Sequence, residues 1–189
     1  MKSLLKILPC CLVALFVAEL VAVLVPKKDG QFHTREFGRL PVLMNGRIQP
    51  FDSVARNSLL QIRSTADVPL EEVPSWKFWH HPKKLKSTDW LLELMFQPEQ
   101  ADERPVFLIH HPELLSELNL QDQGVEKSGL RYYTMNQVRP VIRVIWDQAT
   151  QARKVQEESQ RTPLQKQVVK LQNALFLYQN LRNAVRPPE

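Results

Sequence analysis

Four of the five histidines stand in two adjacent pairs, His80–His81 and His110–His111, and imidazole is a ligand for metal ions and for haem iron. Neighbouring side chains diverge on a helix or a strand, so neither pair resembles the i, i+4 histidines of a metalloprotease. The four imidazoles are candidates for a haem site only if the fold brings the two pairs together beside Trp76 and Trp79. Packing, helix capping and solvent exposure are the alternative roles of these side chains.

The sequence lacks the residue patterns of catalytic and nucleotide-binding sites. It has no GxSxG, GxGxxG or GxxxxGK[ST] motif, and no cysteine after Cys11 is available as a nucleophile, a metal ligand or half of a disulfide. Only five glycines accompany 14 prolines, and this balance favours helices joined by stiff connectors. We therefore predict a protein that is not an enzyme and has no metal site.

The chain of 189 residues is long enough for one domain with an appendage, and its apolar residues concentrate at the start. Residues 7–26 are apolar except for Glu19, and a helix of this length spans the roughly 30 Å hydrocarbon core of a bilayer. A cleaved signal peptide is the alternative, but Phe16 and Leu20 are bulky where a cleavage site needs a small residue. We predict a transmembrane anchor over residues 1–26 and an extracytoplasmic, mainly helical domain over residues 27–189.

The formal charge of the chain is +5, of which +3 comes from Glu19 and the four lysines that flank the apolar segment. The rest of the chain carries +2 and has no arginine-rich stripe with interleaved aromatic residues, so nucleic acid is not expected as a partner. Membrane lipid is expected around the anchor. A short basic lead before an apolar segment usually stays in the cytoplasm, which predicts a single-pass protein of a bacterial inner membrane with its C-terminal domain on the periplasmic side.

The domain is predicted to begin with a small β-hairpin and a helix. Residues 40–44 and 47–50 flank Asn45-Gly46, a dipeptide typical of a type I′ turn because both residues tolerate a positive φ. Asp52 is predicted to cap a helix that runs to about Arg63. Residues 64–86 read as an irregular linker with an aromatic anchor.

The second half is predicted to be mainly α-helical. We expect a short helix from residue 87 that Pro98 stops, a strand over 104–110, a helix that starts at His111-Pro112, and a strand over 131–133. Thr134 is expected to cap a helix over 134–156, kinked by Pro140, and Thr162-Pro163 to start a last helix. These two helices predict a C-terminal antiparallel hairpin about 36 Å long. The aliphatic and tyrosine seam of the last helix is predicted to lie in the core: Leu164, Val168, Leu171, Leu175 and Tyr178.

Two segments, FGRLPV over 37–42 and GRIQPFDSVAR over 46–56, resemble part of the CcsA/ResC-type membrane proteins of System II cytochrome c biogenesis. In that family a pattern like G-R-[IV]-x-P-[LMF]-[DN]-[TS]-x-A follows an early membrane span on the extracytoplasmic side. The RPVF segment from Arg104, the HPEL segment from His111 and the long helical region are similar too, so the resemblance covers most of residues 37–183. The positions that carry the pattern are Gly38, Pro41, Gly46, Arg47, Pro50, Ala55 and Arg56.

The resemblance implies a role in presenting haem, or in attaching it to apocytochrome c, outside the inner membrane. The family's tryptophan-rich haem motif and its later membrane spans with histidine ligands do not occur here, so no haem ligand is carried over. The resemblance implies an N-terminal module, truncated or part of a split protein, that contacts a membrane-embedded cytochrome c assembly protein and meets haem through the complex. Arg47 and Arg56 are candidates to contact haem propionates or the partner, or to form ordinary surface ion pairs.

Two other functions stay open at this point. One is a generic single-pass scaffold whose helical hairpin binds another protein. The other is a histidine–metal enzyme, which predicts stoichiometric metal in the purified protein.

Overall fold

The computed structural model describes residues 13–21, 33–71, 83–127 and 129–185, and it divides into two units after His33. Helices account for 59% of the described residues, which confirms the mainly α prediction. In the first unit, residues 13–21 are helical with exposed side chains. No helix among the described residues combines the length and the apolar character needed to cross a membrane. Most of the predicted anchor, residues 7–26, lies outside the described ranges.

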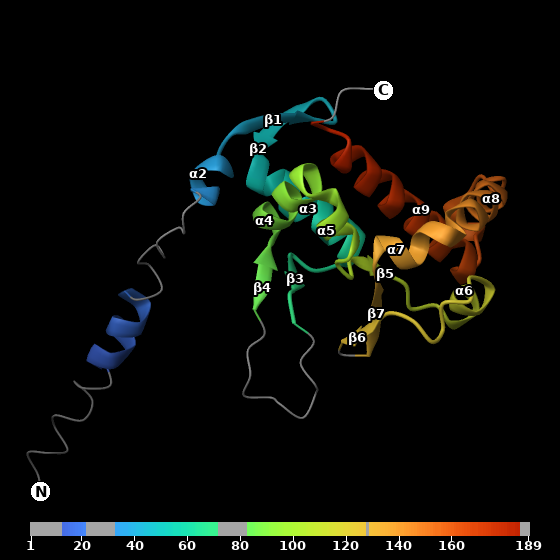
Figure 1. Ribbon diagram of the computed structural model, residues 1–189, viewed down its shortest axis with the longest axis horizontal. Coiled ribbons are helices and arrows are strands. Elements are labelled where there is room, and N and C mark those ends of the chain that lie inside the picture. The colour runs from blue at the N-terminus through green and yellow to red at the C-terminus, as the bar shows by residue number, and fades with distance from the viewer. Residues whose placement is uncertain (1–12, 22–32, 72–82, 128, 186–189) are drawn as a thin grey trace, which may run out of the picture. The chain divides into compact units, whose positions relative to one another are not determined.

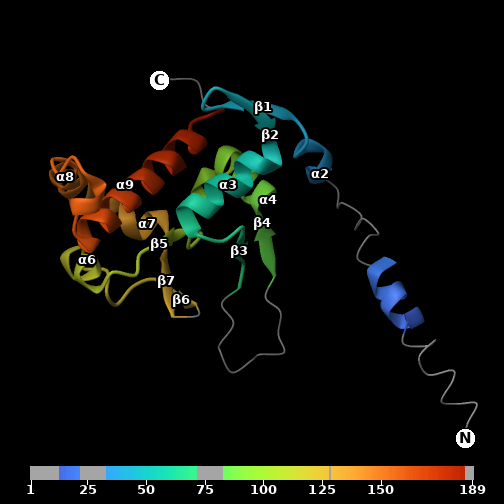
Figure 2. The ribbon, with the colours of Figure 1, turned by 180° about the vertical axis from the view of Figure 1, so that it is seen from behind.

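The second unit joins short helices and three small antiparallel sheets to two longer helices (Figures 1 and 2). Its described helices are α2 (Thr34–Phe37), α3 (Phe51–Arg63), α4 (Ser87–Phe96), α5 (Pro98–Asp102), α6 (Pro112–Glu117), α7 (Met135–Val138), α8 (Ile142–Arg153) and α9 (Pro163–Arg182), with 3₁₀ turns η1 (Arg139–Val141) and η2 (Glu158–Gln160). Its described strands are β1 (Pro41–Met44), β2 (Arg47–Pro50), β3 (Asp67–Pro69), β4 (Lys84–Lys86), β5 (Phe107–Leu108), β6 (Val125–Lys127) and β7 (Leu130–Tyr133). The sheets are β1–β2, β3–β4 and β5–β7–β6.

The predicted hairpin and the helix after it are both present. Asn45 and Gly46 have φ angles of 52° and 73°, so both turn residues adopt the left-handed conformation that a type I′ turn needs. Helix α3 ends at Arg63 as predicted. The prediction of a cap at Asp52 is wrong, because the helix already begins at Phe51 with Pro50 as its N-cap.

The single helix predicted over 134–156 is wrong, because Pro140 divides it. Proline has no N–H to donate, and the chain passes from α7 through the 3₁₀ turn η1 before α8 begins. Helix α8 has 12 residues, or about 18 Å, which is half the predicted length. It packs against α9, but Figure 1 shows α8 nearly end-on while α9 lies across the view. The C-terminal helix pair is therefore shorter than the predicted antiparallel hairpin of about 36 Å.

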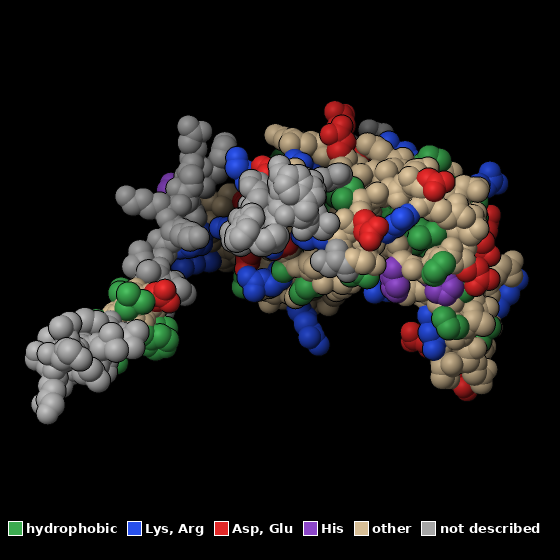
Figure 3. Space-filling view, turned by 90° about the horizontal axis from the view of Figure 1, so that it is seen from below, with side chains coloured by type: hydrophobic (Ala, Val, Ile, Leu, Met, Phe, Trp, Pro, Cys, Tyr) green, Lys and Arg blue, Asp and Glu red, His purple; other side chains and the backbone are tan. Residues whose placement is uncertain are grey.

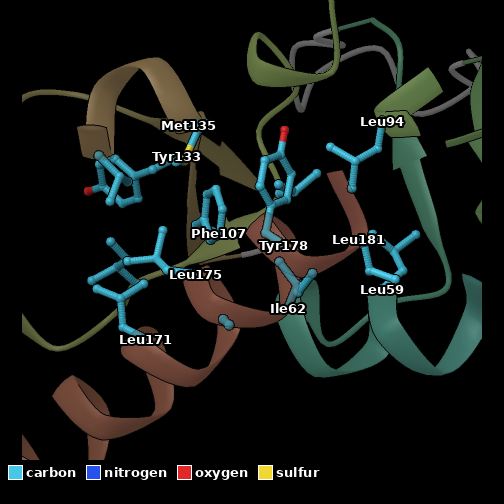
Figure 4. Packing of buried hydrophobic residues seen from close by; sticks show 14 of the residues in the cluster. Leu59, Ile62, Leu94, Phe107, Tyr133, Met135, Leu171, Leu175, Tyr178 and Leu181 are labelled. Atoms are coloured by element: carbon cyan, nitrogen blue, oxygen red, sulfur yellow. The ribbon is translucent and has the colours of Figure 1, made fainter. Parts of the chain in front are cut away.

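The core lies where α3, α4 and α9 meet the β5–β7 strand pair (Figure 4). Helix α9 contributes Val168, Leu171, Leu175 and Tyr178 to the core, which confirms these four positions of the predicted seam. Leu164, the first predicted position, is only partly buried and packs against the core from its edge. The Tyr178 ring lies 5.1 Å from that of Phe107 between ring centroids. This core provides the rigid base for the hairpin and for the surfaces described next.

Candidate functional site

The β1–β2 hairpin exposes one face that is entirely apolar. Side chains alternate between the two faces of a strand, and residues opposite each other across a strand pair share a face. In the observed register Leu43 lies opposite Ile48 and Pro41 lies opposite Pro50. All four residues are exposed, Leu43 by 71% and Ile48 by 77% of their surface. We name these four residues the outer hairpin face.

The other face of the hairpin fixes it to the domain. Val42 and Met44 pack against the core cluster. Before β1 the chain folds back on the start of α3, where the Asp52 amide donates to the Gly38 carbonyl at 2.9 Å. A Cβ on Gly38 would lie 3.2 Å from the Cβ of Asp52, so the close approach favours glycine there. The hairpin is thus held in place from both sides of its turn.

The remaining residues of the resemblance pattern have mostly structural roles. Gly46 supplies the second positive φ of the turn, and Ala55 is fully buried in the core. Arg56 pairs with Asp52 at 3.4 Å in an exposed i, i+4 ion pair, the ordinary role that we gave as its alternative. Arg47, at the start of β2, is exposed, so it stays a candidate for contact with a partner.

The histidines that the structure describes do not assemble a ligand set by themselves. His80–His81 lies outside the described residues, His33 is exposed, and His110 and His111 occupy the loop before α6, exposed and half-buried respectively. His111 is the N-cap residue of α6, but its side chain makes no capping bond and its buried Nδ1 has no hydrogen-bond partner. In the space-filling view, histidine side chains reach the surface among mixed acidic and basic groups (Figure 3). Haem ligation by the two pairs together therefore stays a prediction.

No metal site is evident in the part of the chain that the structure describes, where no three His, Cys, Asp or Glu side chains gather as a ligand group. A charged cluster is instead built around Asp102, which is 3% exposed. The Tyr178 hydroxyl donates to Asp102 Oδ1 at 2.9 Å, and Arg139 and Arg182 pair with Oδ2 at 2.5 and 3.2 Å. Burial, and next the charge of Asp102, raise the pKa of Tyr178. Tyr178, Arg139 and Arg182 all bind the Asp102 carboxylate, so the cluster joins α5, η1 and α9.

A second buried charge, Arg63, also serves the fold. It is 1% exposed, its Nε donates to the Asp67 carbonyl at 3.1 Å, and its Nη1 donates to the Pro105 carbonyl. The guanidinium lies over the ring of Tyr132, 3.9 Å from the centroid. Arg63 therefore joins α3 to the start of β3, to the segment before β5 and to β7.

The second unit is therefore a mainly helical module whose most exposed large apolar side chains, among those described, are Leu43 and Ile48. Sequence patterns had placed both residues in the hairpin without separating the exposed face from the packed one. The two-residue turn fixes which side chains share a face, so the sequence contained the information needed to separate the two faces.

No protein-family model matches the chain, and no curated protein matches it either.

Proposed function

We propose that this protein is a membrane-anchored accessory module of a cytochrome c assembly complex, and that it acts by protein contacts without catalysis of its own. The observation that supports this most is the outer hairpin face. It is an exposed apolar surface, of the kind that proteins bury against a partner. It is formed by the same segment that resembles the System II proteins, so the resemblance and the exposed surface point to one region of the chain.

The proposed partner is a membrane-embedded assembly protein of the CcsA/ResC type in a bacterial inner membrane. Residues 7–26 serve as the anchor, surrounded by lipid, and the domain is periplasmic. Fourteen residues, 27–40, separate the anchor from β1, and a fully extended chain of that length reaches at most about 50 Å. The hairpin therefore stays within reach of the extracytoplasmic loops of a neighbouring membrane protein.

Haem enters this proposal only through the complex. The described imidazoles are His110 and His111 in adjacent positions and the isolated His33, and adjacent side chains do not converge on one iron. When bound in the complex, haem is the group that is attached to the cytochrome, and the module's part is to hold the partner in position.

The test is the affinity of the full chain, in neutral detergent, for the CcsA/ResC-type protein encoded by the same genome. The variant is Leu43→Ser with Ile48→Ser, and the matched control is Val144→Ser with Phe176→Ser, which removes two apolar side chains exposed by 43% and 58% elsewhere. Burial of the remaining area of Leu43 and Ile48 contributes about 1–2 kcal/mol each. The double variant should therefore bind about 30- to 700-fold more weakly.

The outcomes separate the proposal from its competitors. Wild-type affinity in the hairpin variant would refute docking through the outer hairpin face, and no binding by the wild type would refute this partner. The scaffold alternative requires a partner surface on α8 and α9. Val168, Leu171 and Leu175 of α9 are buried in the chain's own core, so that surface would have to use exposed side chains such as Val144 and Phe176. A loss confined to the α8–α9 control variant would favour that alternative.

A further inference from the structure

A groove of about 470 Å³ lies between the C-terminal end of α3 and the first half of α9. Helices α3 and α9 pack side by side in the domain (Figure 2), and Glu158 of η2 also lines the groove. None of its lining residues belongs to the hairpin. They are Leu60, Gln61, Glu158, Arg161, Lys166, Gln167, Val169, Lys170, Asn173 and Ala174.

The lining carries three cations against one acid, Glu158. Within the described part of the chain, Arg161, Lys166 and Lys170 make no ion pair. The Nε of Arg161 donates to the Val155 carbonyl at 3.1 Å, which holds the guanidinium in place and leaves its terminal nitrogens as further donors. The groove is therefore a positively charged surface with unused donors, and it attracts anions.

The two walls of the groove differ in character. Lys166 and Lys170 stand one helical turn apart on α9, so their Cβ atoms are about 6 Å apart. The α3 wall presents Leu60, whose surface is 42% exposed. On the α9 side Asn173 accepts a hydrogen bond from Arg153 at 2.8 Å, which brings a fourth cation next to the groove. A ligand that fits must pair with spaced cations on one side and an apolar side chain on the other.

We propose that this groove binds an extended acidic peptide of the pattern acid–apolar–acid. Residues i and i+2 of an extended chain lie on one face about 6.6 Å apart, close to the spacing of Lys166 and Lys170. The residue between them points to the opposite side, toward Leu60. The cations are spread along the wall instead of converging on one point, which suits two separate carboxylates better than a single phosphate.

The probe is a fluorophore-labelled, end-blocked peptide with the sequence Gly-Glu-Leu-Glu-Gly, titrated into the full chain in neutral detergent and followed by anisotropy. Binding should saturate and should weaken as salt is raised, because the contact is charged. The variant Lys166→Glu with Lys170→Glu should bind at least tenfold more weakly. Lys166→Gln with Lys170→Gln should show an intermediate loss, and it serves as the second variant if charge reversal disturbs folding.

The control variant is Lys83→Glu with Lys86→Glu, two exposed lysines outside the groove, which should keep wild-type affinity. Absence of saturable binding would overturn the proposal. So would equal affinity for the uncharged peptide Gly-Gln-Leu-Gln-Gly, or a loss of affinity in the control variant as large as that in Lys166→Glu with Lys170→Glu. Binding of inorganic phosphate or phosphatidylglycerol vesicles in place of the peptide would also overturn it. The hairpin variant Leu43→Ser with Ile48→Ser should bind the peptide normally, so this result does not depend on the proposed partner.

Discussion

Tyr178→Phe is the substitution that tests most directly how the domain is held together. It removes a single oxygen, the one that donates to the buried Asp102 carboxylate at 2.9 Å. The ring keeps its place beside Phe107, at 5.1 Å, and Trp90, at 6.4 Å between centroids. The change therefore isolates one hydrogen bond between α9 and α5 without opening a large cavity.

The expected loss follows from the charge and burial of the acceptor. A hydrogen bond to a charged group contributes about 1.5–3 kcal/mol to stability. Arg139 and Arg182 still pair with Asp102 in the variant, so the carboxylate is not left without partners. We therefore expect the lower part of that range, about 1.5–2 kcal/mol less free energy of unfolding. Asp102→Ala should cost more, about 3 kcal/mol, because it also leaves the Tyr178 hydroxyl buried without an acceptor.

The pH dependence gives the same substitution a second readout. Burial, with Asp102 next, raises the pKa of Tyr178 above its ordinary value near 10. An unfolded chain releases this proton from about pH 10 upward while the folded chain retains it. The contribution of Tyr178 to stability is therefore complete below pH 10 and is lost as the pH rises above it. Phenylalanine has no such proton, so the variant should lose stability less steeply.

Urea unfolding of the full chain, followed by tryptophan fluorescence at pH 8 and again between pH 10 and 11, measures both quantities. A difference in unfolding free energy below about 0.5 kcal/mol at pH 8 would refute the role of the hydrogen bond. Equal slopes above pH 10 would refute the inferred pKa direction, since the other tyrosines are the same in both proteins.

Three further stability predictions use thermal or urea unfolding of the same chain. Gly124→Ala should cost about 2–3 kcal/mol, because φ is 84° and the new Cβ would lie 2.7 Å from the Tyr133 ring; Gly129→Ala, with φ of 76° and open space around it, should cost about 1 kcal/mol. Thr162→Ala should cost about 1 kcal/mol by removing the N-cap of α9. Arg63→Met should cost about 2–5 kcal/mol, because two backbone carbonyls lose their donor.

Each of these has a result that would contradict it. Equal losses at the two glycines would show that the left-handed backbone alone, without the ring contact, sets the cost. A neutral Thr162→Ala would mean that water replaces the cap. Arg63→Lys retains the charge but not the two-pronged geometry, so it should fall between the wild type and Arg63→Met; a stability equal to that of Arg63→Met would show that geometry decides.

Local sequence signals predicted the elements whose cause is itself local. Asn45-Gly46 predicted the turn, and the expected cap at Thr134 is present. The last helix begins at Thr162-Pro163 as predicted, and Thr162 accepts a hydrogen bond from the backbone amide three residues on. Over residues 134–156 two local signals competed, and the effect of Pro140 on the helix was underestimated. A helical apolar pattern over 134–156 suggested continuity, but Pro140 removes a donor inside it, and the helix divides there.

Features that depend on distant partners were missed for a physical reason. Strands β3 and β4 fall within a segment read as a linker, because they pair residues 67–69 with 84–86 and neither strand has enough alternation of its own. The sequence analysis did not identify Arg63 or Asp102 as buried charges. Arg63 donates to Pro105, 42 residues away, and Asp102 accepts from Tyr178, 76 residues away. The residues next to Arg63 and Asp102 in the sequence therefore do not predict that these charges are buried.

Residues that hold the hairpin in the fold cannot test the function, whereas residues on its exposed face can. The pattern residues Gly38 and Gly46 secure the hairpin through a close approach and a positive φ, so their replacement reports on folding. Leu43 and Ile48 are about three quarters exposed, so we expect their replacement to leave the fold unchanged. A loss of partner binding on changing these two residues, with unfolding free energy unaltered, is therefore the result that separates a docking surface from a hairpin that serves only the fold.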